Sequence, residues 1–281
     1  MISLFILIFT TALGKADGLI VPSVHGPTIN LEKTPVYPKK QKYKGPILLD
    51  ARSQFDYALG HLPGAVSIRW EDYSQTQEPH KGGLDPDFSL LSRKLRYLGI
   101  NPEKEVIVLG LGERGKGEEG RIAWMLEFMG IKKIKVENLI NVPGRKTIED
   151  TARYESVPPW NPKPDYSLRV KKSEVQEIVE KKPTDKIIID VRDTLAFKKE
   201  KSISGAINIP WNQFINAQGE PVKIDKIKDL LSAKKINPDA NLIFYSEDGV
   251  TSGYVTFTVS QAGLHAQNYD GGYNEWSGDV K

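Results

Sequence analysis

The chain has 281 residues, which is too long for one typical small domain and sufficient for two, each able to bury a hydrophobic core. Hydrophobic residues make up 39% and charged residues 27%, as in an ordinary soluble protein, and the net charge of +3 gives no electrostatic case for nucleic acid as a partner. The sequence contains no cysteine, which excludes disulfides, thiolate metal sites and cysteine nucleophiles. Its four histidines show no metal-ligand spacing, so neither a metal nor a cofactor is expected.

The chain begins with an apolar run, residues 2–13, that is too short to span a bilayer as a helix, which needs about 20 residues. The run is typical of the hydrophobic part of a secretory signal, although no Lys or Arg precedes it. We therefore predict a signal peptide over residues 1–16, export to the periplasm or out of the cell, and no stable transmembrane segment in the mature chain. A retained N-terminal membrane anchor and a misassigned start are the alternatives. Residues 17–44 are rich in Pro and Lys, which predicts an irregular tether.

The first buried strand is expected over residues 46–50, where an apolar run ends at the aspartate of an Asp-x-Arg motif, and the same pattern returns in a second buried strand over residues 186–190. Further matching pairs follow in the same order: Gly64-Ala65-Val66 with Gly205-Ala206-Ile207, Ile100-Asn101-Pro102 with Ile236-Asn237-Pro238, Val106-Ile107-Val108 with Leu242-Ile243-Phe244, and Gly130-Ile131 with Gly263-Leu264. This internal repeat predicts a duplication. We place the first domain at residues 45–150, a linker at 151–164 and the second domain at 165–281.

Strand and helix patterns alternate within each half. Buried strands are expected over residues 106–109 and 242–245, and helices over residues 90–98, 122–129 and 224–234. Residues 254–259 have strand-like propensity, but their counterpart in the repeat is helical by pattern, so we predict helix there as well. The alternation predicts an α/β fold with two tandem domains, each a parallel sheet flanked by helices, and ligands at the carboxyl ends of the strands.

The loop after the strand at residues 242–245 is the candidate site. It runs from Ser246 to Thr251 and leads into a helix, so backbone N–H groups and the positive end of the helix point at one spot. Such a cradle stabilises an anion or a thiolate. The repeat places Ser246 opposite Gly110, so residues 110–117 are expected to be a degenerate counterpart, longer by three residues. That first loop nearly fits a phosphate-binding pattern, but its last position holds glycine instead of a hydroxyl residue, so nucleotide binding is the weaker alternative.

Several motifs recur in order along the chain. They are Asp-x-Arg in both halves, Gly60-His61-Leu62-Pro63-Gly64-Ala65 with a weaker version at 202–206, the segment Leu242-Ile243-Phe244-Tyr245-Ser246-Glu247-Asp248-Gly249-Val250-Thr251, and Tyr269-Asp270-Gly271-Gly272-Tyr273-Asn274-Glu275-Trp276. Together they resemble the tandem-domain rhodanese family of thiosulfate and 3-mercaptopyruvate sulfurtransferases, over roughly residues 45–281. The resemblance implies two rhodanese-like domains, of which the second carries the active-site segment Cys-x-x-Gly-Val-Thr and the first is degenerate and non-catalytic.

By this resemblance, Ser246 stands at the position of the persulfide-forming cysteine of the family. The substrate or anion loop that the resemblance implies consists of Glu247, Asp248, Gly249, Val250 and Thr251. A serine hydroxyl cannot form a persulfide, so the protein as written is expected to be a catalytically impaired pseudoenzyme. Glu247 and Asp248 stand where thiosulfate-specific members tend to carry basic residues, and they oppose binding of a dianion. Arg192 is a candidate substrate contact, with a structural role at its strand end as the alternative.

Three functions remain open. The first is a non-catalytic rhodanese-like protein that binds a small sulfur compound, an oxyanion or a protein partner. The second is an active thiosulfate or 3-mercaptopyruvate sulfurtransferase whose natural residue 246 is cysteine or selenocysteine, after an engineered change or a recoded codon. The third is a hydrolase that uses Ser246, for which no histidine is obviously placed as the base. The complete lack of cysteine favours the first, because an engineered protein often keeps other cysteines.

Overall fold

The computed structural model describes residues 45–144, 146–148, 154–199 and 202–278. The predicted signal peptide and tether, residues 1–44, lie outside the described residues, and both stay predictions. In the described part of the chain, no helix combines the length and the apolar character needed to cross a membrane.

The first half folds around a four-stranded parallel sheet with the order β2-β1-β3-β4. Its strands are β1 (Ile47–Asp50), β2 (Ala65–Ser67), β3 (Glu105–Gly110) and β4 (Lys133–Asn138). Its helices are α1 (Gln54–Leu59), α2 (Phe88–Tyr97) and α3 (Glu118–Phe128), with short 3-10 helices η1 (Trp70–Tyr73) and η2 (Gly112–Arg114). Leu49 of β1 lies between Val66 and Val108 of the neighbouring strands, so apolar side chains line up across the sheet.

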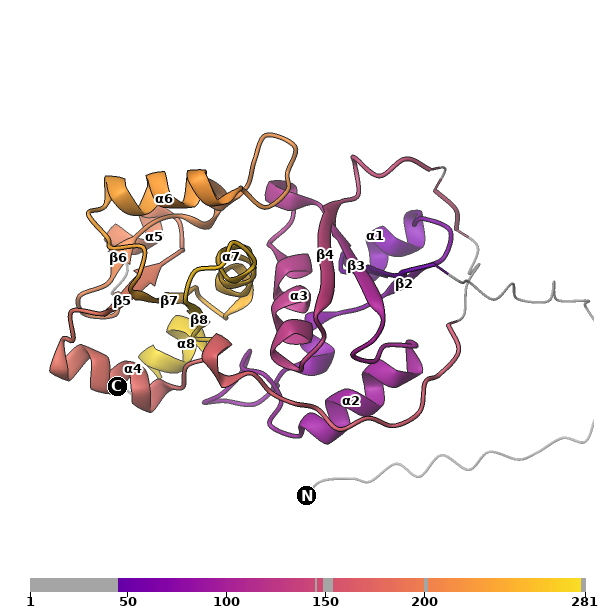
Figure 1. The fold of residues 1–281 in the computed structure, drawn as a ribbon, viewed down its shortest axis with the longest axis horizontal. Coiled ribbons are helices and arrows are strands. Elements are labelled where there is room, and N and C mark those ends of the chain that lie inside the picture. Colours follow the sequence, from indigo (N-terminus) through magenta and orange to yellow (C-terminus); the bar gives the residue numbers. More distant parts are fainter. Residues whose placement is uncertain (1–44, 145, 149–153, 200–201, 279–281) are drawn as a thin grey trace, which may run out of the picture. The chain divides into compact units, whose positions relative to one another are not determined.

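The second half repeats this arrangement with the order β6-β5-β7-β8 (Figure 1). Its strands are β5 (Lys186–Asp190), β6 (Ile207–Asn208), β7 (Asn241–Tyr245) and β8 (Ala266–Asn268). Its helices are α4 (Lys172–Lys181), α5 (Thr194–Lys199), α6 (Ile224–Ala233), α7 (Val250–Gln261) and α8 (Gly272–Ser277), with 3-10 helices η3 (Tyr166–Leu168) and η4 (Trp211–Phe214). The shared strand order confirms the predicted fold class of two tandem α/β domains with parallel sheets.

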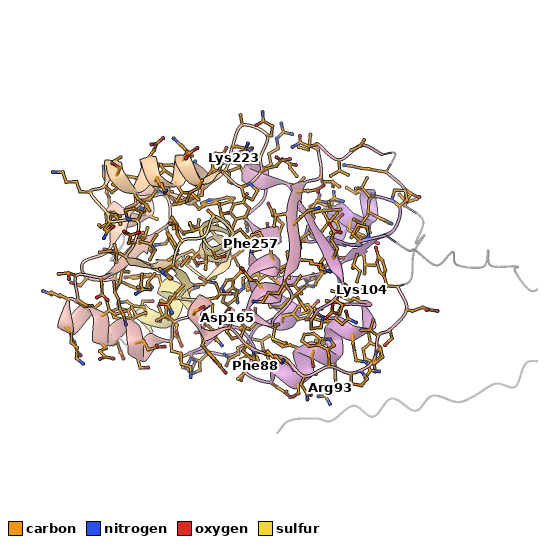
Figure 2. The ribbon with its side chains drawn as sticks, viewed as in Figure 1. Phe88, Arg93, Lys104, Asp165, Lys223 and Phe257 are labelled. Atoms are coloured by element: carbon orange, nitrogen blue, oxygen red, sulfur yellow. The ribbon has the colours of Figure 1, made fainter. Side chains whose placement is uncertain are left out.

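Helices α3 and α7 pack against each other and join the two halves (Figure 1). A Cβ added at Gly120 of α3 would lie 2.4 Å from the Cα atom of Tyr254 on α7, so this close approach requires glycine. Phe257 of α7, labelled in Figure 2, belongs to the apolar cluster of the first half. Each helix lies between its own sheet and the other helix, which buries it on nearly all sides. This packing explains why residues 254–259 are helical, as predicted, despite their strand propensity.

The N-termini of α3 and α7 differ from the sequence-based expectations. Both helices are capped by a glycine in the left-handed region, Gly117 with φ 77° and Gly249 with φ 79°, and neither has a side-chain cap. Gly117 is seven residues beyond Gly110, whereas Gly249 is three beyond Ser246, so the first loop is longer by four residues and not by three. The polar first turn of α3 lies outside the hydrophobic period, which is why the predicted helix began too late.

Candidate functional site

The candidate loop connects the carboxyl end of β7 to the N-terminus of α7. Its path depends on Gly249, because a Cβ added there would lie 2.1 Å from the carbonyl oxygen of Asp270. The loop is also held from the opposite side, since the N–H of Tyr273 donates a 2.8 Å hydrogen bond to the carbonyl oxygen of Ser246. Asp270 and Tyr273 belong to the closing motif of the sequence, which therefore anchors the loop.

Several backbone N–H groups of the loop make no hydrogen bond within the described residues. Among the residues that the structure describes, no acceptor lies within hydrogen-bond distance of the N–H groups of Glu247, Asp248, Gly249, Thr251 and Ser252. Two of these groups belong to the first turn of α7, where the helix dipole is positive. These are the groups that the predicted anion or thiolate cradle requires.

Ser246 lies beneath the loop and is only 2% exposed. Its Oγ atom is 3.2 Å from the Oγ atom of Ser252, and either hydroxyl can be the donor. Within the described ranges, Ser252 is the only side chain that hydrogen-bonds to Ser246. A hydroxyl is not a general base at neutral pH, so the serine has no activating partner.

The two Asp-x-Arg motifs lie at equivalent strand ends, after β1 and β5. Arg52 donates from Nε and Nη2 to the carboxylate of Asp50 and from Nη2 to the carbonyl oxygen of Gly60. Arg192 holds the buried Asp190 in the same way, at 2.9 Å between Nη2 and Oδ2. Burial acts to lower the pKa of Arg192, and the hydrogen bonds and charge of Asp190 outweigh it, so the pKa is raised and the guanidinium stays charged.

The carboxylates in the middle of the loop are partly engaged by the protein itself. Glu247 accepts a 3.1 Å hydrogen bond from Nη1 of Arg192, although the Glu247 side chain is 50% exposed. Asp248 accepts a 3.2 Å hydrogen bond from the N–H of Val250. Arg192, the candidate substrate contact, therefore reaches the loop through Glu247.

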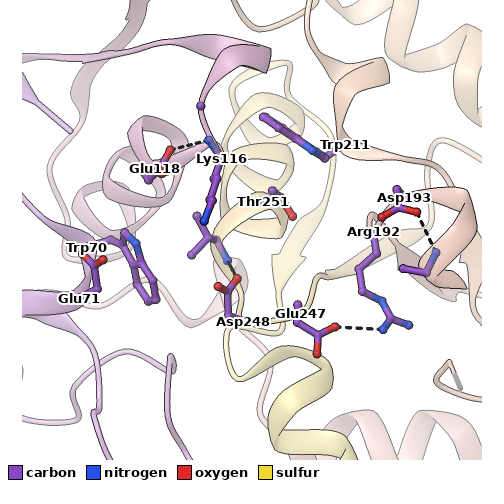
Figure 3. A pocket seen from close by; sticks show the side chains of 13 residues that line it. Trp70, Glu71, Lys116, Glu118, Arg192, Asp193, Trp211, Glu247, Asp248 and Thr251 are labelled. Carbon is purple, nitrogen blue, oxygen red and sulfur yellow. Dashed lines mark hydrogen bonds and ion pairs between the residues drawn. The ribbon is translucent and has the colours of Figure 1, made fainter. Parts of the chain in front are cut away.

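A cavity of about 530 Å³ lies beside the loop and is lined by both halves of the chain (Figure 3). Four of the six loop residues line it: Glu247, Asp248, Val250 and Thr251. Arg192, Asp193, Ala196 and Trp211 complete the part from the second half, and Trp70, Glu71, Gly115, Lys116 and Glu118 come from the first half. Ser246 and Gly249 are not among the lining residues. The cavity thus borders the outer side of the loop, with Ser246 behind it.

Sequence reasoning did not identify the first-half wall of this cavity. Trp70 and Trp211 occupy equivalent positions in η1 and η4, at the same offset in the repeat as Gly64 and Gly205. The repeat alignment therefore contained a signal for the tryptophan pair. Lys116 gave no comparable signal, because its loop has no counterpart of equal length in the second half.

A buried arginine from the first half supports the same loop. Arg121 of α3 is 1% exposed, and its Nη2 atom donates to the carbonyl oxygen of Gly82 at 2.9 Å. Its Nη1 atom contacts the carbonyl oxygen of Gly249 at 3.4 Å, and its guanidinium lies 4.6 Å over the ring of Trp124. Burial lowers the pKa of Arg121 to about 10, against the opposing charge of Asp270. The left-handed turn of the loop is therefore fixed by residues of both halves.

The counterpart loop in the first half is filled by a side chain of its own helix. A Cβ added at Gly110 would lie 2.2 Å from the carboxylate of Glu119. Glu119 is 2% exposed and accepts a 3.0 Å hydrogen bond from the N–H of Gly112. Burial raises the pKa of Glu119 to about 7, while backbone hydrogen bonds act in the other direction. A carboxyl group of the protein thus occupies the space next to Gly110.

The fold and the site define a class of protein: two like α/β domains joined through paired helices, each with a strand–loop–helix junction, of which the second leaves backbone N–H groups without an acceptor among the described residues. A family model described as the Rhodanese-like domain matches residues 36–138 and 171–279, and the chain belongs to this family. The expectation from the sequence motifs is confirmed.

Relatives of known function match most of the chain. The sulfur carrier protein TtuD of Thermus thermophilus is 24% identical over 245 residues, which cover 78% of this chain and 83% of that protein. The 3-mercaptopyruvate sulfurtransferase of Escherichia coli K12 is 24% identical over 236 residues, which cover 79% of this chain and 82% of that protein. These relatives support a rhodanese-like sulfurtransferase-family protein.

Solved structures share the fold. The 3-mercaptopyruvate sulfotransferase SseA of Escherichia coli superposes with a TM-score of 0.68 at 23% identity, covering 81% of this chain and 92% of that one. An EanB variant in complex with ergothioneine superposes with a TM-score of 0.72 at 20% identity, covering 87% of this chain. This chain spans slightly less than two thirds of EanB, 65% of its length. At these identities the likeness shows the fold alone.

Proposed function

We propose that this chain is a non-catalytic member of the rhodanese-like family that binds a small molecule in the cavity beside residues 246–251. The observation that carries the proposal is Ser246, at the position where the sulfurtransferases of the family have their persulfide-forming cysteine, in a chain that contains no cysteine. The chain therefore lacks the cysteine sulfur that accepts sulfane sulfur in the sulfurtransferases of the family.

The chemistry of sulfur transfer supports this proposal. The thiolate of a sulfurtransferase attacks the sulfane sulfur of the donor, forms an S–S bond, and releases the rest of the donor as the leaving group. A serine oxygen holds no sulfane sulfur, and its proton is far more tightly bound than that of a thiol. The hydroxyl of Ser252 is the one side-chain partner of Ser246 in the described ranges, so a serine hydrolase also lacks its base.

Retention of the loop supports a binding role. The N–H groups of the loop have no acceptor among the described residues, and an open cavity lies next to them. In the first half, by contrast, the equivalent space is filled by Glu119. We infer that the second loop is kept open for a ligand, with Arg192 supporting it through Glu247.

Two assays test the proposal. With thiosulfate and cyanide, we expect no thiocyanate above the level of a Ser246→Ala control. After incubation with 3-mercaptopyruvate, which carries less negative charge than the dianion thiosulfate, Ser246→Cys should gain the mass of one sulfur atom. The change replaces one chalcogen atom by another in a site whose backbone is fixed by Gly249 and Asp270, so the variant should fold. Thiocyanate formation by the Ser246 protein would refute the non-catalytic role, and a folded Cys variant that never takes up sulfur would show that the cradle is lost.

The second candidate function is an active sulfurtransferase, which the relatives' activities favour if natural residue 246 is cysteine or selenocysteine. The codon for residue 246 in the source genome and the intact mass of the native protein distinguish the two. A serine codon together with the mass of the printed sequence supports the non-catalytic role.

We also propose that the chain is exported, on the strength of the apolar run at residues 2–13. N-terminal sequencing of protein from its native host should then find a mature chain that begins near Lys15 or Asp17. An intact Met1 in a cytosolic fraction would contradict export, and an intact Met1 in the membrane fraction would favour the anchor instead.

A further inference from the structure

The cavity beside the loop carries an excess of negative charge. Five carboxylate side chains line it, against two basic ones. The carboxylates are those of Glu71, Glu118, Asp193, Glu247 and Asp248. Two of these charges are balanced by neighbouring groups outside the lining: Arg192 donates from Nε and Nη2 to the buried carboxylate of Asp190, and the carboxylate of Glu71 lies 3.5 Å from Nε of Arg69. Lys116 is the other base, and the carboxylates around it outnumber it, so the cavity attracts cations and repels oxyanions.

Two tryptophans line the same cavity from opposite sides (Figure 3). Trp211 is held in place by Tyr254, whose ring meets it edge-on at 5.7 Å between centroids, and by the close approach of Gly117. Trp70 packs partly against the core of the first half. Both indoles are thus anchored on the protein side while they face a cavity with carboxylates. Aromatic rings together with carboxylates bind organic ammonium ions, because the ring face and the anion both attract a diffuse positive charge.

We propose that this cavity binds an organic ammonium ion, held between Trp70 and Trp211 and the carboxylates of the loop. The inference rests on the proposed function, in which this cavity is the ligand site, and it names the class of ligand. The volume of about 530 Å³ is that of a small-molecule site. A dianion such as thiosulfate is the wrong ligand for the cavity, because the carboxylates that line it, Glu247 and Asp248 among them, repel negative charge.

Calorimetric titration of the full chain with choline tests the inference. The matched neutral probe is 3,3-dimethylbutan-1-ol, which has the shape of choline without its charge, and thiosulfate is the anionic probe. We expect choline to bind about tenfold more tightly than the neutral isostere, since a ring face and a partly desolvated carboxylate both act on the charge alone. Thiosulfate should neither bind more tightly than choline nor displace it.

Variants then assign the binding to these side chains. Trp70→Leu keeps an apolar side chain and removes the ring, and it should weaken choline binding about fivefold to tenfold. Because Trp70 also packs against the core, Trp70→Phe serves as a second variant that retains a smaller ring. Its affinity for choline should lie between that of the original chain and that of Trp70→Leu. Asp248→Asn should weaken binding about threefold, as expected for one charge at a partly exposed position. Glu103→Gln, which removes an exposed carboxylate outside the cavity, should leave binding unchanged.

The inference is overturned if the neutral isostere binds as tightly as choline, if thiosulfate binds more tightly, or if Trp70→Leu and Trp70→Phe both fold and bind choline like the original chain. Failure of the proposed function has a different readout. Thiocyanate formation by the Ser246 protein refutes the non-catalytic role without changing the choline titration, and a loss of choline preference leaves the absence of turnover intact.

Discussion

The loops that follow β3 and β7 occupy equivalent positions in the internal repeat, but a side chain fills the first and not the second. After β3, the space next to Gly110 is occupied by the carboxyl group of Glu119. After β7, the equivalent position holds Ser246, whose hydroxyl contacts only the hydroxyl of Ser252 among the described side chains. The N–H groups of this loop have no acceptor in the described part of the chain. The sheets around the two loops have the same strand order. The comparison teaches that the two domains share the sheet and differ in the interior of the loop, which is filled by a carboxyl group in the first and not in the second.

The largest effect is expected where the second loop is most constrained. Gly249→Ala places a Cβ 2.1 Å from the carbonyl oxygen of Asp270 at a residue with φ of 79°, so both contact and backbone conformation oppose the change. We expect a loss of about 4 kcal/mol in the free energy of unfolding, from left-handed strain and overpacking together. Urea denaturation measures it.

Gly205→Ala is the matched control for this prediction. Gly205 has nearly the same φ, 80°, but nothing lies within 4 Å of an added Cβ. The Gly205→Ala variant should therefore lose only about 1 kcal/mol in the free energy of unfolding, which is the cost of the left-handed conformation. Equal losses in the two variants would show that the contact with Asp270 does not constrain the loop.

The second prediction concerns the loop after β3, which Glu119 fills, and the dependence of the free energy of unfolding on pH. The pKa of Glu119 is about 7 in the folded protein, against an ordinary value of 4.5, so the folded state binds this proton more tightly than the unfolded state. The contribution of Glu119 to stability is therefore complete below pH 4.5 and is lost as the pH rises through about 7. The loss amounts to at most roughly 3 kcal/mol.

Glu119→Gln should remove this loss, because the amide has no proton to give up. The difference in unfolding free energy between variant and original chain, measured by urea denaturation below pH 4.5 and above pH 7, isolates the effect from other groups. Glu103→Gln, which changes an exposed glutamate, should follow the original chain. A Glu119→Gln variant whose stability changes with pH as the original does would contradict the raised pKa.

The smallest of the three effects tests whether the two features of the first loop depend on each other. Gly110→Ala places a Cβ 2.2 Å from the Glu119 carboxylate, which has to move, and it should cost about 2 kcal/mol. In a Glu119→Ala background the space is empty, and the same change should cost less than about 1 kcal/mol. A double-mutant cycle by chemical denaturation gives the coupling, and a coupling near zero would separate the glycine from the glutamate.

Much of the fold could be predicted because it depends on local pattern. The apolar run that ends at Asp190 was predicted at the bounds that β5 has, and the ordered repeat implied two domains with one strand order. The same repeat placed Ser246 at the loop after β7. Helix N-termini were less predictable, since the caps of α3 and α7 are glycines, which carry no side-chain signal.

The sequence by itself determined the duplication, the family and the absence of cysteine, because each of these follows from the order and kinds of residues along the chain. Only the tertiary structure decided what surrounds that loop. Trp70 and Trp211 come together with Lys116 because η1, η4 and the long first loop meet when the two halves pack. Glu119 of α3 reaches the space next to Gly110 at the end of β3 because the loop between them lets the helix fold back against the strand. Such contacts depend on packing distances that no spacing in the sequence records.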